Sequence, residues 1–165
     1  MNDQTMITIA SPIGPLRLYG TDEILTCVWL PEGRGIAPSA PGRETRVLAA
    51  AATQLAEYFA GTRTTFDLPL APEGTAFQQG VWRVLSTIPF GATWSYGDVA
   101  RLIGQPTASR AVGAANGKNP IAIIVPCHRV IGSSGALTGY GGGMAAKQWL
   151  LGHEGHPAQP QLPLG

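Results

Sequence analysis

The stretch that most constrains the fold of this chain is residues 121–131, IAIIVPCHRVI. Five apolar residues lead into Pro126, and Cys127, His128 and Arg129 then interrupt the apolar run. Because buried imidazole and guanidinium groups are unfavourable without partners, the run must surface here or meet a polar pocket. Pro126 favours an extended approach, since its ring fixes φ and removes a backbone donor. We therefore expect an apolar strand that delivers three chemically active side chains to one place.

Cys127 has two interpretations at this point. A cysteine inside an apolar run is most often a small buried hydrophobe. However, His128 follows it directly, and Glu154 lies near the end of the last predicted helix, so the chain also offers a nucleophile, a base and an orienting carboxylate. Neighbouring residues on a strand point to opposite faces, so Cys127 and His128 would couple through a water or across a turn.

The cysteines and histidines argue against a disulfide framework and against zinc. Two cysteines among 165 residues predict free thiols and a cytoplasmic protein. No CxxC or HxxxH spacing occurs among these residues, so we expect no metal and no other cofactor. No apolar run reaches the roughly 18 residues that a membrane span needs, and the N-terminus has no apolar leader, so we expect no membrane association.

The charge of the chain is unevenly divided. Residues 1–73 hold five basic and eight acidic residues, for a net charge of −3, whereas residues 74–165 hold six basic and two acidic residues, for +4. A basic half joined to an acidic half indicates that the basic half meets a polyanion. Chance fluctuation in a small protein is the alternative.

The first half of the chain predicts a small α/β domain. Three β-rich runs, 4–10, 14–20 and 24–30, are separated by turn residues and predict an antiparallel meander. Residues 44–61 have apolar residues at helical spacing and end at a glycine, which predicts a helix. Because the charge balance changes sign near residue 74, we expect an N-terminal α/β domain with its linker over 1–73 and a second domain over 74–165.

The second half predicts mostly helices. Thr75, Ser95 and Thr107 are expected N-caps of helices that end near Pro89, Gly104 and Gly117, and residues 143–155 predict a last helix. The first of these helices should bury one apolar face, formed by Phe77, Val81, Trp82 and Leu85. A helix, a short turn and a second helix predict a helix-turn-helix motif over residues 95–117. Together the two halves predict an α+β fold.

The second helix of this motif carries unusually small side chains, Ala108, Ser109, Ala111, Gly113 and Ala114. Such side chains let a helix approach DNA closely, but they read little sequence, which suits a protein that visits every sequence through the minor groove. Arg110 is the one long side chain near the start of this helix. The alternative is a helix packed inside the fold, with alanine and glycine as spacers.

Two tyrosines and a glycine run add further candidates. The phenols of Tyr96 and Tyr140 could donate to a leaving group or frame a flat ligand, although half-buried packing is the more common role. Residues 141–143 are all glycine, which is consistent with a backbone that approaches a ligand closely.

Three motifs together carry a resemblance to a known family. PCHRV (126–130), preceded by SRAVGAANGKNP (109–120) and followed by GYGGGMAAKQWLLGHEG (139–155), resembles the 6-O-alkylguanine-DNA alkyltransferases, the methylated-DNA–protein-cysteine methyltransferases, of the bacterial type without a zinc site. The resemblance covers residues 76–156 closely and the first 73 residues only by the order of their elements. It implies a ribonuclease H-like N-terminal domain and a C-terminal domain with a winged-helix-like helix-turn-helix and an active-site loop.

The resemblance also implies an activity. The protein would repair double-stranded DNA by direct reversal, moving an alkyl group, usually methyl, from O6 of guanine or O4 of thymine irreversibly to Cys127. Since that oxygen lies inside the duplex, the base must be flipped out. Each molecule would react once and would need no cofactor. It would be monomeric in solution, and cooperative binding along DNA is left open.

The family pattern assigns roles to individual residues. Cys127 would accept the alkyl group, and His128 would take its proton through a water while Glu154 orients His128. Asn119 would tie the turn of the helix-turn-helix to the active-site loop, and Tyr96 would donate a proton to the departing guanine.

Further residues are expected to contact the substrate base or the DNA. Arg110 would fill the gap left by the flipped base, and Tyr140 would line the base pocket. The remaining expected contacts are Ser95, Thr107, Ala108, Ser109, Ala111, Gly113, Ala114, Asn116, Gly117, Arg129 and Gly141. Gly141 departs from the family, because many members have a serine there that donates to the guanine oxygen. A backbone N–H must then serve, which leaves the range of accepted alkyl groups open.

Three other classes compete with this interpretation. A non-catalytic lesion binder of the same fold would lack the cysteine, which is present here. A helix-turn-helix regulator would carry base-reading side chains on its second helix, and this helix lacks them. A cysteine hydrolase would turn over many times, so product counting separates it from a protein that reacts once.

Overall fold

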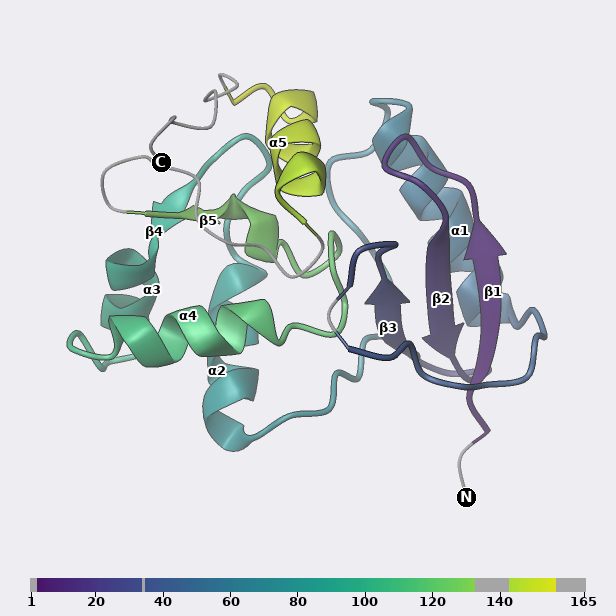
Figure 1. Cartoon of the computed structure of the whole chain (residues 1–165), viewed down its shortest axis with the longest axis horizontal. Helices are drawn as coiled ribbons and strands as arrows, with labels where there is room; N and C mark the ends of the chain where they lie inside the picture. The colour runs from purple at the N-terminus through teal and green to yellow at the C-terminus, as the bar shows by residue number, and fades with distance from the viewer. Residues whose placement is uncertain (1–2, 34, 133–142, 157–165) are drawn as a thin grey trace. The chain divides into compact units, whose positions relative to one another are not determined.

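A computed structural model describes residues 3–33, 35–132 and 143–156 of the 165-residue chain. The chain forms two compact units (Figure 1). The first contains Met1–Glu73 together with Pro120–Ile124, and the second contains Gly74–Asn119 together with Val125–Gly165. The boundary at residues 73 and 74 lies where the charge balance changes sign. Residues 120–124 return to the first unit, so neither unit is one continuous stretch of the chain, unlike the expected domains over 1–73 and 74–165.

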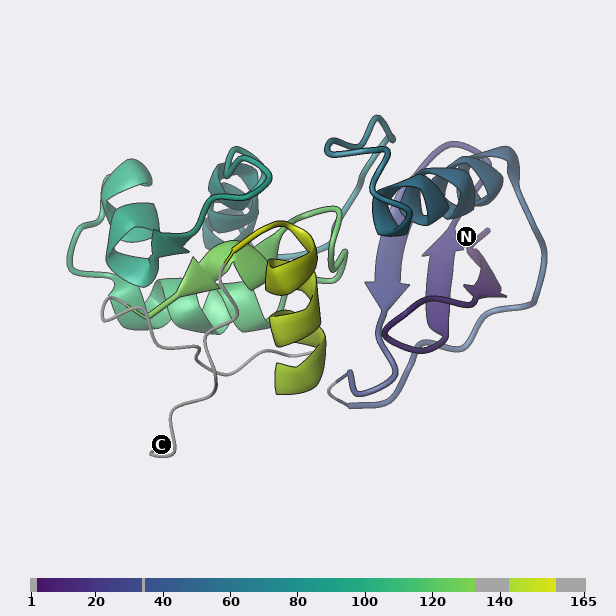
Figure 2. The same ribbon diagram turned by 90° about the horizontal axis from the view of Figure 1, so that it is seen from above.

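The first unit is a three-stranded sheet with one helix. Strands β1 (Thr5–Ile9), β2 (Leu16–Gly20) and β3 (Leu25–Trp29) pair antiparallel in the order β1-β2-β3, so the predicted meander is confirmed. Helix α1 (Arg46–Phe59) lies along one face of the sheet (Figure 2). The side chains buried between them include Leu16, Leu18, Leu48, Leu55 and Tyr58.

The predicted strand over 121–131 is wrong. Val28 N–H donates to Pro120 O at 2.9 Å, and Ile121 makes a single parallel bridge to Val28. The chain then turns sharply, because Ile123 has a φ of 73° and Ile124 N–H bonds back to Ala122 O at 2.8 Å. This bond pattern is that of a γ-turn, and it ends the strand after one bridge.

A second tight turn leads from Pro126 into the segment that carries Cys127. Pro126 has φ −82° and ψ 63°, and Cys127 N–H bonds to Val125 O at 2.8 Å, as in an inverse γ-turn. The 3₁₀ turn η1 (Cys127–Arg129) and the short strand β5 (Val130–Ile131) follow. Tight turns, rather than an extended strand, therefore set the direction of the Cys127 side chain.

The second unit is mostly helical, as predicted. Its helices are α2 (Ala76–Leu85), α3 (Tyr96–Leu102), α4 (Ser109–Gly117) and α5 (Met144–His153), and strand β4 (Trp94–Ser95) pairs parallel with β5. Helices α3 and α4 form the helix-turn-helix. Capping boxes begin α2 at Thr75 and α3 at Ser95.

Two local predictions for this unit are wrong. Helix α4 begins after Ala108 with no side-chain cap, so Thr107 does not cap it. Of the predicted inner face of α2, Val81, Trp82 and Leu85 are buried but Phe77 is half-exposed. Trp82 Nε1 donates to Ala115 O at 2.9 Å and so fixes α4 against α2. No helix in the described part of the chain is long and apolar enough to cross a membrane.

Candidate active site

The polar pocket that receives His128 and Arg129 is built around Glu154. This residue is the C-cap of α5, and its side chain is buried. Its Oε2 lies 2.8 Å from His128 Nε2 and accepts from Arg129 Nη2 at 3.0 Å, while Oε1 accepts from Arg129 Nε at 2.7 Å. Arg129 Nη1 donates to Ile88 O at 2.6 Å. The apolar run thus meets a polar pocket and does not surface.

Burial changes what Arg129 can do. Its residue exposure is 5%, and its guanidinium is engaged by Glu154 and Ile88. The expectation that Arg129 contacts DNA is therefore replaced by an internal role. It balances the buried Glu154 carboxylate, which would otherwise be strongly unfavourable.

His128 is poised to act as a neutral base. Burial lowers the pKa of His128 below its usual value, and the hydrogen bond to Glu154 offsets only part of this effect. With Nε2–H donating to Glu154, the lone pair is on Nδ1. Nδ1 is buried and has no hydrogen-bond partner within the described ranges. Nδ1 is therefore the atom of His128 on which a proton can be placed.

Cys127 is held by two asparagines from the end of α4 and the turn after it. Asn119 Nδ2 donates to Cys127 Sγ at 3.1 Å and to Val125 O at 2.8 Å. Asn116 Nδ2 lies 3.4 Å from Cys127 O. Asn119 thus joins the end of the helix-turn-helix to the cysteine segment. Asn116 is 3% exposed and lies inside the unit, so it belongs with Cys127 and not with the DNA contacts expected of it.

The exposed face of α4 consists of small and basic residues. Arg110, Ala111 and Ala114 are exposed on the helix, and Thr107 and Lys118 continue the same stripe at its two ends. Val112 and Ala115 are buried on the opposite face. The helix is therefore packed on one side and open on the other, so its small residues are spacers on the packed side, and a DNA contact on the open side stays a prediction.

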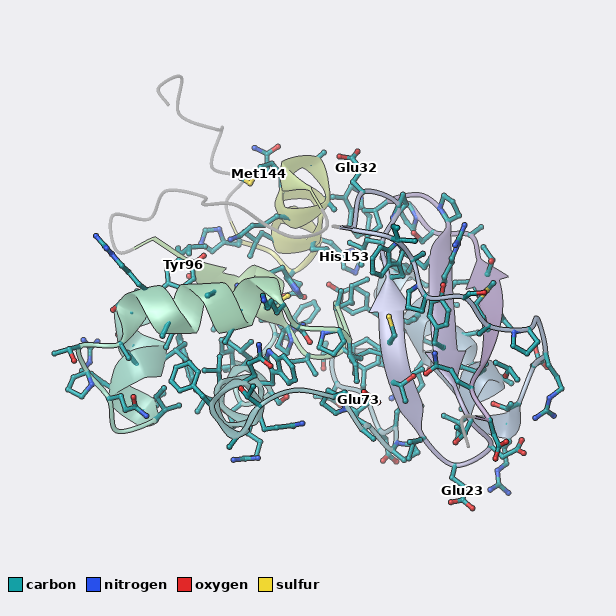
Figure 3. The ribbon with its side chains drawn as sticks, turned by 60° about the horizontal axis from the view of Figure 1, so that its bottom comes forward. Glu23, Glu32, Glu73, Tyr96, Met144 and His153 are labelled. Atoms are coloured by element: carbon teal, nitrogen blue, oxygen red, sulfur yellow. The ribbon has the colours of Figure 1, made fainter. Side chains whose placement is uncertain are left out.

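Tyr96 lies beside α4, at the start of α3 (Figure 3). A Cβ added to Gly113 would lie 3.7 Å from Tyr96 Cε1, so the ring and the helix are in van der Waals reach. Ser95 Oγ accepts from Asp98 N–H at 3.0 Å and is occupied as the helix cap.

The other expected contact residues have less specific positions. Ala108, Ser109 and Gly117 are half-exposed at the ends of α4. Tyr140 and Gly141 lie outside the described residues. Within the described ranges, no group of three or more His, Cys, Asp or Glu residues could hold a metal ion.

Sequence reasoning missed two residues of this site. Asn116 is expected on the DNA face, but it lies on the buried side of α4, four residues after the buried Val112, and its amide faces Cys127 O. Lys147, in AAKQWLL, is the second: it is fully buried, and its Nζ donates to Val130 O at 2.7 Å, directly after the cysteine turn. Lysine is rarely buried in this way, so the sequence carries no signal for it.

Fold and site together define a helix-turn-helix protein that holds a cysteine beside a buried His–Glu pair. The chain belongs to the 6-O-methylguanine DNA methyltransferase family. Residues 76–156 match the model of the DNA binding domain of 6-O-methylguanine DNA methyltransferase, and residues 6–72 match the model of its ribonuclease-like domain.

Individual relatives are similar to this chain over nearly its whole length. A methylated-DNA–protein-cysteine methyltransferase of Mycolicibacterium paratuberculosis is 52% identical over 159 residues, which cover 95% of this chain and 96% of the relative. The crystal structure of Mycobacterium tuberculosis O6-methylguanine methyltransferase has a TM-score of 0.84 and 51% identity, covering 98% of both chains. The Mycobacterium tuberculosis protein in complex with DNA has a TM-score of 0.84 and 53% identity, covering 93% of both chains.

Proposed function

We propose that this protein repairs double-stranded DNA by transferring a methyl group from O6 of guanine to Sγ of its own Cys127. The observation that carries the proposal is the placement of Cys127 in the same buried turn as His128. Its sulfur accepts a hydrogen bond from Asn119, and His128 is bonded to Glu154. Such a setting suits a thiolate nucleophile with a neutral base beside it.

The chemistry balances with the residues present. The thiol proton of Cys127 passes to Nδ1 of His128, through a water in our proposal, and leaves a thiolate. The sulfur lone pair forms a bond to the methyl carbon while the bond between that carbon and guanine O6 breaks. The electron pair stays on the guanine, which takes up a proton, and Tyr96 is the proposed donor. The product is a thioether, which no side chain here can hydrolyse, so each molecule reacts once.

The exposed face of α4 is the proposed DNA contact. The small side chains of Ala111 and Ala114 allow close approach, and Arg110 and Lys118 add positive charge at the ends of the stripe. Since small side chains cannot read base edges, binding should be largely independent of sequence. Arg110 is proposed to enter the stack where the modified base leaves it.

Two finer points belong to the same proposal. Transfer from O4 of thymine is expected by the same in-line attack, since that oxygen also carries its alkyl group inside the duplex. A cytoplasmic location is proposed because neither Cys27 nor Cys127 forms a disulfide.

The decisive experiment is the intact mass of the protein after incubation with duplex DNA that contains O6-methylguanine. The expected result is a gain of one methyl group per molecule, mapped to Cys127 by peptide analysis, and no further turnover. Cys127→Ser should bind the DNA and gain no methyl group. Cys27 is the matched control, because burial raises its pKa to about 12 and leaves it inert at neutral pH. Cys27→Ser should still be methylated, whereas methyl-free protein or repeated turnover would refute the proposal.

A further inference from the structure

The proposed proton donor, Tyr96, is the first residue of α3, and a capping box closes the start of this helix. Ser95 Oγ accepts from Asp98 N–H at 3.0 Å, and Asp98 Oδ2 accepts in return from Ser95 N–H at 2.9 Å. Tyr96 lies inside this box, because it follows Ser95 directly. The proposed reaction gives Asp98 no part, although its carboxylate fixes the backbone from which the phenol projects.

The carboxylate of Asp98 is itself held in place. Its other oxygen, Oδ1, accepts from Arg101 Nη2 one turn further along α3. The hydrogen bond from the Ser95 backbone is the main cause that lowers the pKa of Asp98 below its usual value, so the group is charged at neutral pH. Because the side chains of Asp98 and Arg101 are both exposed, their ion pair adds little to stability. The bond to Ser95 is therefore the contact through which Asp98 acts.

Ser95 also ties Tyr96 to the segment that carries the nucleophile. Strand β4 ends at Ser95 and pairs parallel with β5, so that Ser95 lies opposite Ile131 (Figure 1). Val130, the first residue of β5, donates its N–H to Cys127 O and closes the 3₁₀ turn η1. One short ladder therefore links the start of α3 to the backbone of the cysteine. The capping box sets the direction in which the chain leaves that ladder.

Helix α4 limits where the ring of Tyr96 can lie. A Cβ built on Gly113 would lie 3.7 Å from Cε1 and 3.8 Å from Cδ1 of the ring. Both distances are ordinary van der Waals contacts, so the ring lies against α4 while Ser95 and Asp98 fix its backbone. A general acid contributes only when it is within hydrogen-bond reach of the group that takes its proton. The start of α3 is thus as important to the donor as the phenol itself.

We propose that Asp98 is a positioning residue for the transfer, which holds the Tyr96 phenol where the departing guanine takes up its proton. Asp98 acts through Ser95 and Tyr96 and takes part in no bond change. The inference rests on the proposed function, in which Tyr96 is the donor, and deepens it by naming what keeps that donor in place. The second unit also provides a matched control, since Thr75 and Gln78 form the same capping box at the start of α2.

The first experiment compares the two boxes. Asp98→Ala removes the bond to Ser95 N–H, and Gln78→Ala removes the equivalent bond to Thr75 N–H, each bond being 2.9 Å long. Both variants should lower the urea midpoint by similar amounts, since each loses one half of a box. At saturating duplex with O6-methylguanine, Asp98→Ala should transfer methyl at least about tenfold more slowly, which is part of the roughly 100-fold or more that a positioned acid contributes. Gln78→Ala should keep the wild-type rate.

A conservative variant completes this comparison. Glutamate is common at this position of a capping box, so Asp98→Glu should recover most of the transfer rate. An Asp98→Ala protein that transfers at the wild-type rate, or an equal loss of rate in Asp98→Ala and Gln78→Ala, would overturn the inference.

The second experiment asks whether Asp98 acts through the phenol. Tyr96→Phe removes the proton donor and keeps the ring, so it should slow transfer by roughly 100-fold or more. Adding Asp98→Ala to Tyr96→Phe should cause no further loss, because no donor is left to position. Losses that multiply overturn the inference, and so does a Tyr96→Phe protein that transfers at the wild-type rate.

Alkylation of Cys127 by iodoacetamide separates the donor from the nucleophile. The leaving group is then iodide, which needs no proton, so Asp98→Ala should be alkylated at the wild-type rate. A slower reaction would mean that the change disturbs the cysteine turn through β4 and β5, which contradicts a role through Tyr96. Failure of the proposed function is seen separately, since the wild type would then gain no methyl group from the duplex.

Discussion

Asn119 and Cys127 are joined by a side-chain hydrogen bond in which Nδ2 lies 3.1 Å from Sγ. The same nitrogen lies 2.8 Å from Val125 O, which fixes the orientation of the amide. An N–H that points at sulfur favours the charged form of a thiol over the neutral form. The end of the helix-turn-helix thus contributes directly to the state of the nucleophile.

Asn119→Asp should slow methyl transfer, because it replaces this donor with a carboxylate that repels a thiolate. A hydrogen bond to a charged group contributes about 1.5–3 kcal/mol, so loss of the donor alone should lower the rate by roughly 10- to 150-fold, and the added repulsion should lower it further. The rate constant for loss of O6-methylguanine from a duplex checks this. Asn119→Ala, which removes the donor and adds no charge, should be less impaired. Equal rates in the two variants would mean that Asn119 only anchors the Val125 carbonyl.

Glu154→Gln should impair both folding and transfer, for separable reasons. It leaves the Arg129 guanidinium buried without a carboxylate, which should lower the free energy of unfolding by about 3–5 kcal/mol. It also weakens His128 as a base, because a neutral amide stabilises a protonated imidazole less than a carboxylate does. Urea unfolding and single-turnover kinetics measure the two effects.

The double variant Glu154→Gln with Arg129→Met separates them. Removing both charges should restore most of the stability, since a buried ion pair is often replaceable by apolar groups. The transfer rate should stay low. If the rate recovers together with the stability, Glu154 serves only to hold Arg129.

The backbone of Ile123 should make glycine unusually well tolerated at position 123. A β-branched residue with φ 73° is strained by about 1–2 kcal/mol, and glycine relieves this strain. We compare the unfolding free energy of the Ala variant minus that of the Gly variant at each position. This difference should be smaller for Ile123→Ala and Ile123→Gly than for Ile121→Ala and Ile121→Gly, by about 1–2 kcal/mol, because only alanine at position 123 keeps the strain. Ile121 is the matched control, because it is equally buried and has no positive φ. Urea unfolding of the four variants checks this, and equal differences at both positions would mean that the turn stores no strain.

The stability of the protein should fall as the pH is lowered through the range below 6.5. The pKa of His128 is lowered in the folded state, so the unfolded chain binds the proton more tightly in that range. The contribution of His128 to the unfolding free energy is fully present above pH 6.5. Below pH 6.5 this contribution falls by at most about 1.4 kcal/mol for each pH unit. The unfolding free energy of the wild type minus that of His128→Asn should therefore decrease below pH 6.5. A difference that is flat or rises would contradict a neutral buried His128.

The helices of the second unit were predictable because their signals are local. Thr75 and Ser95 each have a polar partner three residues later, and these capping boxes set the starts of α2 and α3. Thr107 lacked such a partner, and the helix began after Ala108 instead. Alternating apolar residues likewise predicted the sheet of the first unit, because one face of β2 is buried beneath α1.

The active-site segment was harder to predict because its shape depends on contacts distant in sequence. Apolar residues at 121–125 look like a strand, but Ile123 has a positive φ, which β-branched residues rarely adopt and which their propensity does not predict. Arg129 and Asn116 looked like surface residues, since their carboxylate and backbone partners come from 25 and 11 residues further along the chain. A buried charged or polar side chain can be predicted from sequence only when its distant partner can be predicted as well.

Arg110→Ala tests base flipping separately from chemistry. If the Arg110 side chain fills the space left by the extruded base, it replaces lost stacking only in a duplex. A free modified guanine needs no extrusion and should react at the same rate with wild type and variant. At saturating duplex, the variant should be slower by about one to two orders of magnitude, which corresponds to a few kcal/mol of unstacking. Inactivation rates with both substrates measure this.

Lys118→Ala is the matched control for that experiment, because Lys118 is also exposed and basic but lies at the opposite end of α4. As a phosphate contact it should weaken binding to every duplex and lower the slope of log affinity against log salt by about one. Saturating DNA should then restore its full rate, since binding alone is affected. If the defect of Arg110→Ala also vanishes at saturation, Arg110 is a second phosphate contact, and another residue must hold the duplex open while Cys127 reacts.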